Sequence, residues 1–447
     1  RPVWQNFVKF LSELPGGDIE RRIARGDQYL RDAGVFFRQY GQAGSTERAW
    51  PLSSIPVLIA ESEWTHISKG LVQRAELLEA VMADLYGPNR LVESGQLPAA
   101  LIANSAEWLR PLVGVKPSSG HFLQFIAFEI GRGPNGQWWV LGDRTQAPSG
   151  SGFALENRVA TARMFTDFYT KANVHRLAGF FRSFRDELQN MCGDGAGRVA
   201  ILTPGPLNDT YYEHAYIARY LGFMLLEGED LTVQNGQVLV RTVAGLRPVS
   251  VLWRRLDSAF ADPLELNEAS SLGTPGLLNA LRHSGVSLVN ALGSGVLEMR
   301  ALLAFLPRIC QSLRGEALAM PNVATWWCGQ DKERDYVIAN AKRMLISPAL
   351  FTRLPFDVDA HSALGGAFRG ETTGSLADWI AQEAQTLVGQ EAVTLSTTPA
   401  YIDGRLQPRP MSIRVFLART AAGWQVMPGG YARIGKTQDA TAIAMQQ

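Results

Sequence analysis

The stretch from Gly136 to Arg158 holds the side chains of this chain that are best suited to chemistry. An apolar run, Trp138 to Leu141, leads directly to the carboxylate of Asp143 and the guanidinium of Arg144. A Ser/Gly turn and a charged triplet follow closely. An acid, a base and flexible backbone crowded into one loop are typical of a site for polyphosphate and a metal ion.

The backbone N–H groups of this loop could also bind an anion. Glycine permits the close approach and positive φ of an anion nest at residues 149–152, although a linker would have the same composition. The phrase ALENR predicts a helix start, where anions are favoured. We expect Arg158 to bind a phosphate or a substrate carboxylate, with a buried ion pair to Glu156 or Asp143 as the alternative. The loop residues expected at a bound polyphosphate are Asp143, Arg144, Ser149, Gly150, Glu156 and Asn157.

Two strands and a helix should position this loop. The apolar runs at 122–128 and 137–141 are joined by GRGPNG, whose Gly, Pro and Asn are hairpin residues. Upstream, apolar residues recur at helical spacing as far as Gly87, which predicts a buried helix face that serves packing. The residues of this apolar stripe are Leu71, Ala75, Leu78, Met82 and Leu85.

From Arg198 onward the pattern becomes that of a parallel sheet. RVAIL predicts a strand, TPGPLND a loop, TYYEHAYIARYLG a helix and FMLLE a second strand. Strands at 249–253 and 286–289, with helices between them, predict a doubly wound layer whose ligands gather at the strand ends. His214 is expected to be a packing residue, or alternatively a catalyst. The residues expected at a substrate are Asn208, Glu213, Arg254, Arg255, Asp257, Asn290, Gly293 and Gly295.

Composition excludes several classes of function. The 447 residues carry 43 basic and 42 acidic side chains, a net charge of +1, without a basic block. Nucleic acid and an anionic membrane are therefore poor partners. The three cysteines form no CxxC pair, which favours a reducing compartment and argues against zinc. No apolar run approaches the roughly 18 residues of a membrane span, and we expect a cytoplasmic protein.

Seven phrases of the chain resemble, in the same order, the circularly permuted ATP-grasp proteins of type 2, and more distantly glutathionylspermidine synthetase-like ligases. They are DRTQAPSGSGFALENR, TPGPLNDTYYEHAYIARYLGF, LWRRLDSAFADPLEL, SLGTPGLLNALR, VNALGSGVLE, NVATWWCGQ and VMPGGYARI. The resemblance implies a mixed α+β and α/β fold, a circularly permuted ATP-grasp fold with a doubly wound pre-ATP-grasp layer. The expected domains are residues 1–195 (helical region with the permuted ATP-grasp C-terminal lobe part), 196–330 (parallel pre-ATP-grasp-like domain) and 331–447 (small lobe and closing hairpin).

The same resemblance implies an ATP-dependent ligase that joins a carboxylate to an amine or thiol through an acyl phosphate, with ATP and Mg²⁺. The substrate would be a small molecule or a peptide. Relatives often occur beside an α-helical companion domain and a transglutaminase-like protease, which are therefore possible partners. The alternative is a catalytically weakened scaffold that binds a nucleotide, a peptide or a partner protein without turnover.

The resemblance also places the metal. Glu129 lies where related proteins have their first metal carboxylate, although a solvated acid at a hairpin end would look the same. Relatives carry a Glu-x-Asn pair where this chain has Gly142 and Arg144, neither of which ligates magnesium through its side chain. Asp143 is left as the second expected ligand, or as a structural partner of Arg144 or Arg158.

Two further positions follow from the resemblance. The nucleotide lobe usually presents a lysine in a phrase such as VxKP, but here LISP has Ser347. A phosphate contact of about 1.5–3 kcal/mol would be lost unless Arg343 or Arg353 replaces it. The closing hairpin, MSIRVFLA with WQVMPGG, joins the ATP site in this family; its glycines Gly429 and Gly430 are expected at the nucleotide. Arg414 and Arg433, paired across it, are expected with Arg158 to be catalytic clamps on phosphate, or else exposed strand charges.

Overall fold

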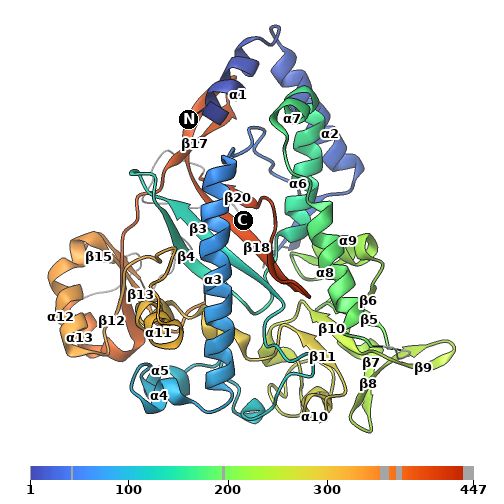
Figure 1. Cartoon of the computed structure of the whole chain (residues 1–447), viewed down its shortest axis with the longest axis vertical. Coiled ribbons are helices and arrows are strands. Elements are labelled where there is room, and N and C mark those ends of the chain that lie inside the picture. The colour runs from blue at the N-terminus through green and yellow to red at the C-terminus, as the bar shows by residue number, and fades with distance from the viewer. Residues whose placement is uncertain (1, 42–43, 194–196, 353–361, 369–374, 436–447) are drawn as a thin grey trace.

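A computed structural model of the chain describes residues 2–41, 44–193, 197–352, 362–368 and 375–435. Its long helix α3 (Glu61–Leu85) contains the predicted apolar stripe, which is buried throughout, so that prediction is confirmed. The helix begins before the stripe, at two acidic residues that suit the positive end of the helix dipole. In Figure 1 it stands upright in front of an antiparallel sheet, below α1 and α7.

That antiparallel sheet joins segments from both ends of the chain. The predicted hairpin of residues 122–141 is present as β3 and β4, and β3 pairs on its other side with β18, from the C-terminal part. The strand order is β17-β18-β3-β4, with β19 and β20 also paired to β18. The strands are β3 (Phe125–Arg132), β4 (Trp138–Arg144), β17 (Thr397–Ile402), β18 (Arg405–Thr420), β19 (Gly423–Val426) and β20 (Tyr431–Ile434).

The predicted parallel layer is also confirmed, with one difference. Its strands run in the order β11-β10-β5-β6 and all adjacent pairs are parallel. Between β6 and β10 lies an antiparallel meander, β7-β8-β9, which we had not predicted. Asn235 and Gly236 both have positive φ, 52° and 73°, as a two-residue hairpin turn requires. The strands are β5 (Val199–Leu202), β6 (Met224–Leu226), β7 (Leu231–Gln234), β8 (Gln237–Thr242), β9 (Gly245–Pro248), β10 (Val251–Arg254) and β11 (Ser287–Val289).

A third, antiparallel sheet lies to one side of α3 (Figure 1). Its order is β12-β16-β13-β14-β15, and its own apolar cluster includes Ile346 and Ile380. The strands are β12 (Thr325–Trp327), β13 (Met344–Pro348), β14 (Ala363–Leu364), β15 (Ala367–Phe368) and β16 (Leu387–Glu391). A separate hairpin near the N-terminus consists of β1 (Phe36–Gly41) and β2 (Gly44–Ala49).

The antiparallel sheet is covered on both faces. Phe128 and Ile130 of β3 pack in the cluster that contains α3, whereas Phe125 and Ala127 point to the opposite face. There Phe125 contacts Trp253 of the parallel sheet, with ring centroids 5.0 Å apart. The remaining helices are α1 (Pro2–Ser12), α2 (Asp18–Asp32), α4 (Arg90–Glu93), α5 (Ala99–Ala103), α6 (Ser151–Met164), α7 (Thr166–Ala172), α8 (Ala178–Asn190), α9 (Tyr211–Leu221), α10 (Leu277–Arg282), α11 (Leu306–Arg314), α12 (Asp331–Asn340) and α13 (Leu376–Gln382).

None of the described helices is long and apolar enough to span a membrane. The predicted division into three domains stays a prediction. The sheets show how the chain crosses its boundaries: β12, before residue 331, pairs with β16 after it. The C-terminal strands β17 to β20 belong to the sheet of β3 and β4.

Candidate functional site

A large cavity of about 1450 Å³ lies beside β20 and collects several of the predicted site residues. Helix α6 contributes a stripe to its wall, spaced three and four residues apart, that includes Asn157 and Arg158. The turn before β20 contributes Gly429 and Gly430, and β20 contributes Arg433. The structure therefore brings together five of the residues that the sequence singled out.

Arg158 is a partly buried cation for which the described residues supply no carboxylate partner. Its Nη2 donates to the Pro428 carbonyl at 3.3 Å, its Nη1 donates to the His175 carbonyl, and no described residue forms an ion pair with it. Burial lowers the pKa of the guanidinium. The alternative of an ion pair with Glu156 or Asp143 does not occur. Glu156 instead accepts a hydrogen bond from Tyr29 Oη at 2.8 Å.

The position of Arg158 depends on a glycine. Gly429 has φ = 146°, a backbone angle that residues with a side chain rarely adopt. A Cβ atom added to Gly429 would lie 2.1 Å from Arg158 Nη2. The neighbouring Asn157 is also held in place, because its Oδ1 accepts from Trp50 Nε1 at 2.7 Å. This part of the cavity wall is therefore fixed before any ligand arrives.

Glu129 lies in the middle of β3 and is fully buried, so the interpretation as a solvated hairpin-end acid was wrong. Its Oε1 contacts Arg414 Nε and Nη2, both at 2.5 Å, and Arg433 Nη1 at 3.7 Å. Burial alone would raise the pKa of this carboxyl, but the surrounding guanidinium groups outweigh burial and lower it to about 2. These groups belong to Arg414, Arg433 and Arg144.

We had expected Arg414 and Arg433 to be paired across one hairpin, but they do not lie opposite each other. Arg414 lies opposite Tyr431, and Arg433, on β20, lies opposite Ser412. They are diagonal neighbours that converge on one acid. Arg433 lines the cavity, whereas Arg414 is not among the lining residues, and its Nη1 donates to the Ser149 carbonyl at 2.6 Å.

Asp143 points to the other face of the sheet. In the β3–β4 register Glu129 is opposite Gly142 and Phe128 is opposite Asp143, and neighbouring residues of a strand point to opposite faces. Both oxygens of Asp143 are bound by Arg74 of α3, at 2.6 and 2.7 Å. Arg144, one suggested partner of Asp143, instead contacts Glu298 at 3.1 Å.

The residues present do not fit a magnesium ion at the expected place. The two expected carboxylates face opposite sides of the sheet and each is neutralised by guanidinium groups. Glu129 Oε2 has no hydrogen-bond partner among the described residues, but a cation beside it would be repelled by the arginines that surround that carboxylate. Across the described part of the chain, no group of three or more His, Cys, Asp or Glu residues is placed to hold a metal.

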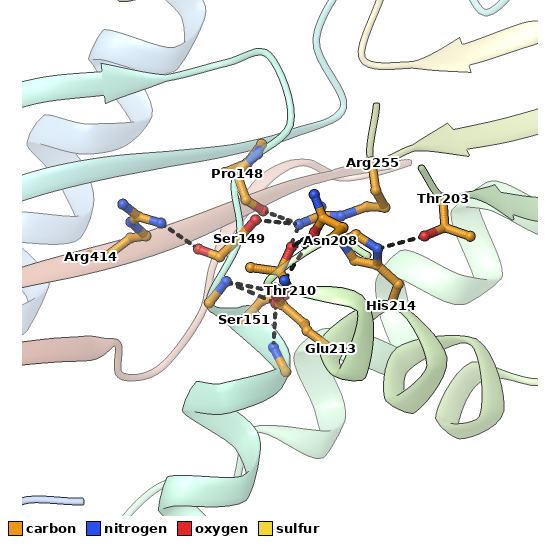
Figure 2. A network of polar contacts seen from close by, with 12 residues as sticks. Pro148, Ser149, Ser151, Thr203, Asn208, Thr210, Glu213, His214, Arg255 and Arg414 are labelled. Carbon is orange, nitrogen blue, oxygen red and sulfur yellow. Dashed lines mark hydrogen bonds and ion pairs between the residues drawn. The ribbon is translucent and has the colours of Figure 1, made fainter. Parts of the chain in front are cut away.

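The predicted anion nest is occupied by the protein itself. The carboxylate of Glu213, on α9, accepts from the backbone N–H groups of Gly150 and Gly152, each at 2.9 Å, and from Ser151 Oγ at 3.2 Å (Figure 2). A Cβ on Gly152 would lie 2.9 Å from Glu213 Cγ. The positive end of α6 is thus satisfied within the chain, where we had expected a phosphate.

Arg255 fixes the same loop from the parallel sheet. Its Nη2 donates to the Pro148 carbonyl at 2.8 Å and to Ser149 Oγ at 3.2 Å, and it lies 3.9 Å from Glu213 (Figure 2). Through Ser149 and Arg414 this network continues to Glu129. Alternating charges therefore connect the two sheets through the loop, which indicates a structural role for these predicted site residues.

The hydrogen bonds of His214 determine its tautomer. Thr210 Oγ1 donates to Asn208 Oδ1 at 2.6 Å, so it can only accept from His214 Nε2, 3.1 Å away. His214 Nδ1 then accepts from Thr203 Oγ1 at 2.9 Å. Burial, and secondarily Arg255, lower the pKa of this histidine. His214 is therefore a neutral residue with both nitrogens bonded, as its interpretation as a packing residue required, and Asn208 serves the same chain of bonds.

The other predicted substrate residues are also engaged internally. Arg254 donates to the carbonyls of Asn290, Leu256 and Ala291, and burial lowers its pKa to about 10. The side chain of Asn290 accepts a hydrogen bond from the Phe125 N–H through Oδ1 and donates one from Nδ2 to the Phe125 carbonyl. Gly293 and Gly295 are closed off, since added Cβ atoms would meet Tyr86 and Glu107. Asp257 is exposed, and none of these predicted residues lines the cavity.

Ser347 is buried on β13, and no residue in the described ranges forms a hydrogen bond with its Oγ. Arg343, a suggested replacement for the missing lysine, is exposed and donates to Asn340 Oδ1 at 2.6 Å. Arg353, the other suggestion, lies outside the described residues.

Sequence reasoning missed Arg74 and Trp50. Arg74 sits three residues after Leu71, inside the apolar stripe of α3, where a charged residue must be paired. That position was the available signal for a buried acid such as Asp143. Trp50, which holds Asn157, itself lines the cavity, and the sequence carries no pattern that indicates this contact.

Comparisons with known proteins agree along most of the chain. The family model described as circularly permuted ATP-grasp type 2 matches residues 56–435. A protein of Synechocystis sp., named only as uncharacterized, is 30% identical over 450 residues, which cover 100% of this chain and 92% of the relative. A Mycobacterium tuberculosis protein, also named uncharacterized, is 33% identical over 440 residues, 96% of this chain and 49% of that protein.

The fold is also similar to a solved structure. A glutathione synthetase-like effector from Globodera pallida, in its apo form, superposes with a TM-score of 0.53, covering 97% of this chain and 93% of the other. The identity is 10%, so this likeness concerns the fold alone.

Proposed function

Since the chain belongs to the circularly permuted ATP-grasp type 2 family, we propose that it is an ATP-dependent ligase that joins a carboxylate to an amine through an acyl phosphate. The observation that supports a substrate site is the cavity in which Arg158, Gly429 and Arg433 meet. The proposal includes a small-molecule or peptide substrate and a cytoplasmic location. A companion α-helical protein and a transglutaminase-like protease remain proposed partners.

The cavity residues have definite tasks in this proposal. Arg158 and Arg433 bind the substrate carboxylate, and Asn157 orients it. Arg158 is held by two backbone carbonyls, so its charge needs little reorganisation when a negative charge develops nearby. ATP supplies the phosphoryl group that activates the carboxylate. Arg414 is a positioning residue, because it binds Glu129 and Ser149 rather than lining the cavity.

A second candidate function, a scaffold that binds ligand without turnover, has a specific observation in its favour. The groups expected to hold phosphate and metal are already engaged: Glu213 fills the nest, and guanidinium groups neutralise Glu129 and Asp143. In addition, Ser347 brings no charge where the family has a lysine. A site with these features binds an anion with arginine alone.

Phosphate release separates the two candidates. The full chain is incubated with ATP and a panel of carboxylic acids and amines, with magnesium and with EDTA. Sustained phosphate release that requires both an acid and an amine supports the ligase and eliminates the scaffold. Release that never exceeds that of the Arg158→Gln variant across the panel eliminates the ligase.

A further inference from the structure

One edge of the antiparallel sheet is open to the cavity. Within the described chain β20 pairs only with β18, and residues 428–435 all line the cavity. The Gly435 N–H donates to the Pro410 carbonyl at 2.9 Å. Since bonded and non-bonded pairs alternate in an antiparallel ladder, the N–H and C=O groups of Ala432 and Ile434 point away from β18. Such a free edge is a template for a further strand.

The cavity is positively charged. Arg158 has no ion pair with a described residue, and the carboxylate nearest Arg433 is already bound by Arg414 at 2.5 Å. Arg409 is 8% exposed, and its Nε has no hydrogen-bond partner in the part of the chain that the structure describes. Glu61, one of the acids on the wall, is paired with His175 at 3.0 Å. The charged lining residues are Lys9, Arg158, Lys171, Arg409 and Arg433 against Glu13 and Glu61.

The size of the cavity and the wall formed by residues 50–60 indicate an elongated ligand. Its volume of about 1450 Å³ exceeds the range of about 300–1,000 Å³ that is usual for small-molecule sites. Residues 50–60 form a wall that is neither helix nor strand and that carries the apolar side chains of Leu52, Ile55 and Val57. An apolar wall, a free strand edge and separate cations match an extended chain that alternates apolar and acidic side chains.

We propose that this cavity binds an acidic peptide in extended form, which pairs with the free edge of β20 and sets its carboxylates against Arg158 and Arg433. This proposal names a substrate class for the proposed ligase. It rests on the proposed function only where it takes the peptide to be the substrate of the ligase. Binding requires neither ATP nor magnesium, so peptide binding and ligase activity are measured separately and fail separately.

Fluorescence anisotropy on the full chain tests the charge requirement. The probe is a fluorescein-labelled hexapeptide of alternating Val and Glu with a free C-terminus, compared with its Gln-containing, C-terminally amidated counterpart. Arg158→Gln and Arg433→Gln should each weaken binding of the acidic probe by roughly tenfold or more. Arg182→Gln, at an exposed site on α8, is the matched control and should bind like the parent. Equal affinity of the two peptides for the parent protein overturns the proposal.

A proline tests the strand pairing. Ala432→Pro removes an outward N–H while keeping the ladder to β18, a position that edge strands tolerate, and Ala432→Ser keeps the N–H. The affinity of the proline variant for the acidic peptide should be about tenfold or more below that of the serine variant. Inorganic phosphate should raise the unfolding temperature of both variants equally in a thermal-shift assay. If both variants bind the peptide alike, the cavity holds a small anion and the proposal is wrong. If the proline variant fails to fold, the comparison of acidic and amide peptides still decides.

Discussion

Glu129 and Arg414 lie directly opposite each other in the register of β3 and β18 and form a buried ion pair with contacts of 2.5 Å. Strands from distant parts of the chain are thus joined by charge as well as by the backbone ladder. The pair occupies the place where the sequence suggested a metal. Removing one partner of such a buried pair lowers stability strongly, because the remaining charge is left without a counter-ion and without hydration.

Replacing Glu129 with Gln should destabilise the fold strongly. The change leaves Arg414 buried without its counter-ion, for which we expect a loss of about 3 to 5 kcal/mol in the free energy of unfolding. Urea unfolding measures it. Glu316→Gln, which removes an exposed ion pair with Arg314, is the control and should leave stability unchanged. Equal midpoints for the two variants would contradict a stabilising role for the buried pair.

The same pair predicts a dependence on acid pH. The pKa of Glu129 falls from 4.5 to about 2 on folding, so the folded state releases this proton more readily. The stabilisation is therefore fully present above pH 4.5 and is lost as pH falls through about 2. The stability difference between the parent and Glu129→Gln should shrink over this window, as thermal unfolding at a series of pH values would show. A difference that stays constant down to pH 2 contradicts the lowered pKa.

Glu107 should have the opposite dependence. Burial, with smaller contributions from Glu298 and Asp257, raises its pKa from 4.5 to about 7. The folded state then holds a proton that the unfolded state has lost, so this group lowers stability as pH rises from 4.5 to 7. Glu107→Gln should be more stable than the parent at pH 8 and about equal at pH 4. The exposed Glu268→Gln is the control in urea unfolding at both pH values.

Gly429→Ala should disturb Arg158. The new Cβ would lie 2.1 Å from Arg158 Nη2, in addition to the strain of a φ of 146°. Gly423→Ala is a matched control, because Gly423 also has positive φ, 100°, but open space around its Cβ position. Both should lose about 1 to 3 kcal/mol of stability from strain, and only Gly429→Ala should also weaken binding of the acidic peptide. Equal peptide affinity in the two variants would separate Gly429 from the site.

Removing Glu213 should open the anion nest. Glu213→Ala frees the amides of Gly150 and Gly152 and leaves Arg255 without its carboxylate. We expect sulfate to raise the unfolding temperature of this variant more than that of the parent, at matched ionic strength against chloride. Glu187→Gln, at an intermediately exposed site on α8, serves as the control. An equal response to sulfate in all three proteins would mean that the nest binds no free anion.

Local patterns predicted most of the elements. The stripe of α3 and the β-branched strands of the parallel layer repeat at the period of their elements, and the structure confirms both. The meander of β7 to β9 was missed although Asn235 and Gly236 carry a recognised hairpin signal. The expected permuted ATP-grasp fold is confirmed by the family match.

The candidate site was harder to predict because it depends on register and on distant partners. Glu129 and Asp143 looked like one metal site, but the register of β3 and β4, which includes a shift after Glu129, places them on opposite faces. The partner of Asp143, Arg74, is 69 residues away in sequence. Glu213 and the Gly150 amide that it fills are 63 residues apart. Arg74 inside an apolar stripe indicates that a buried acid is needed, but local composition does not say which acid, and nothing near Gly150 indicates Glu213.

The pairing of β3 with β18 also has a consequence for folding during synthesis on the ribosome. Glu129 and Arg414 are separated by 285 residues, so at about 5–20 residues per second β3 waits roughly 15 to 60 s for its neighbour. During that interval this edge of β3 is unpaired and the Glu129 carboxylate lacks Arg414 and Arg433. Nascent chains therefore expose an unpaired strand edge until β18 has been synthesised, and the central sheet is completed only after β18 to β20 have emerged.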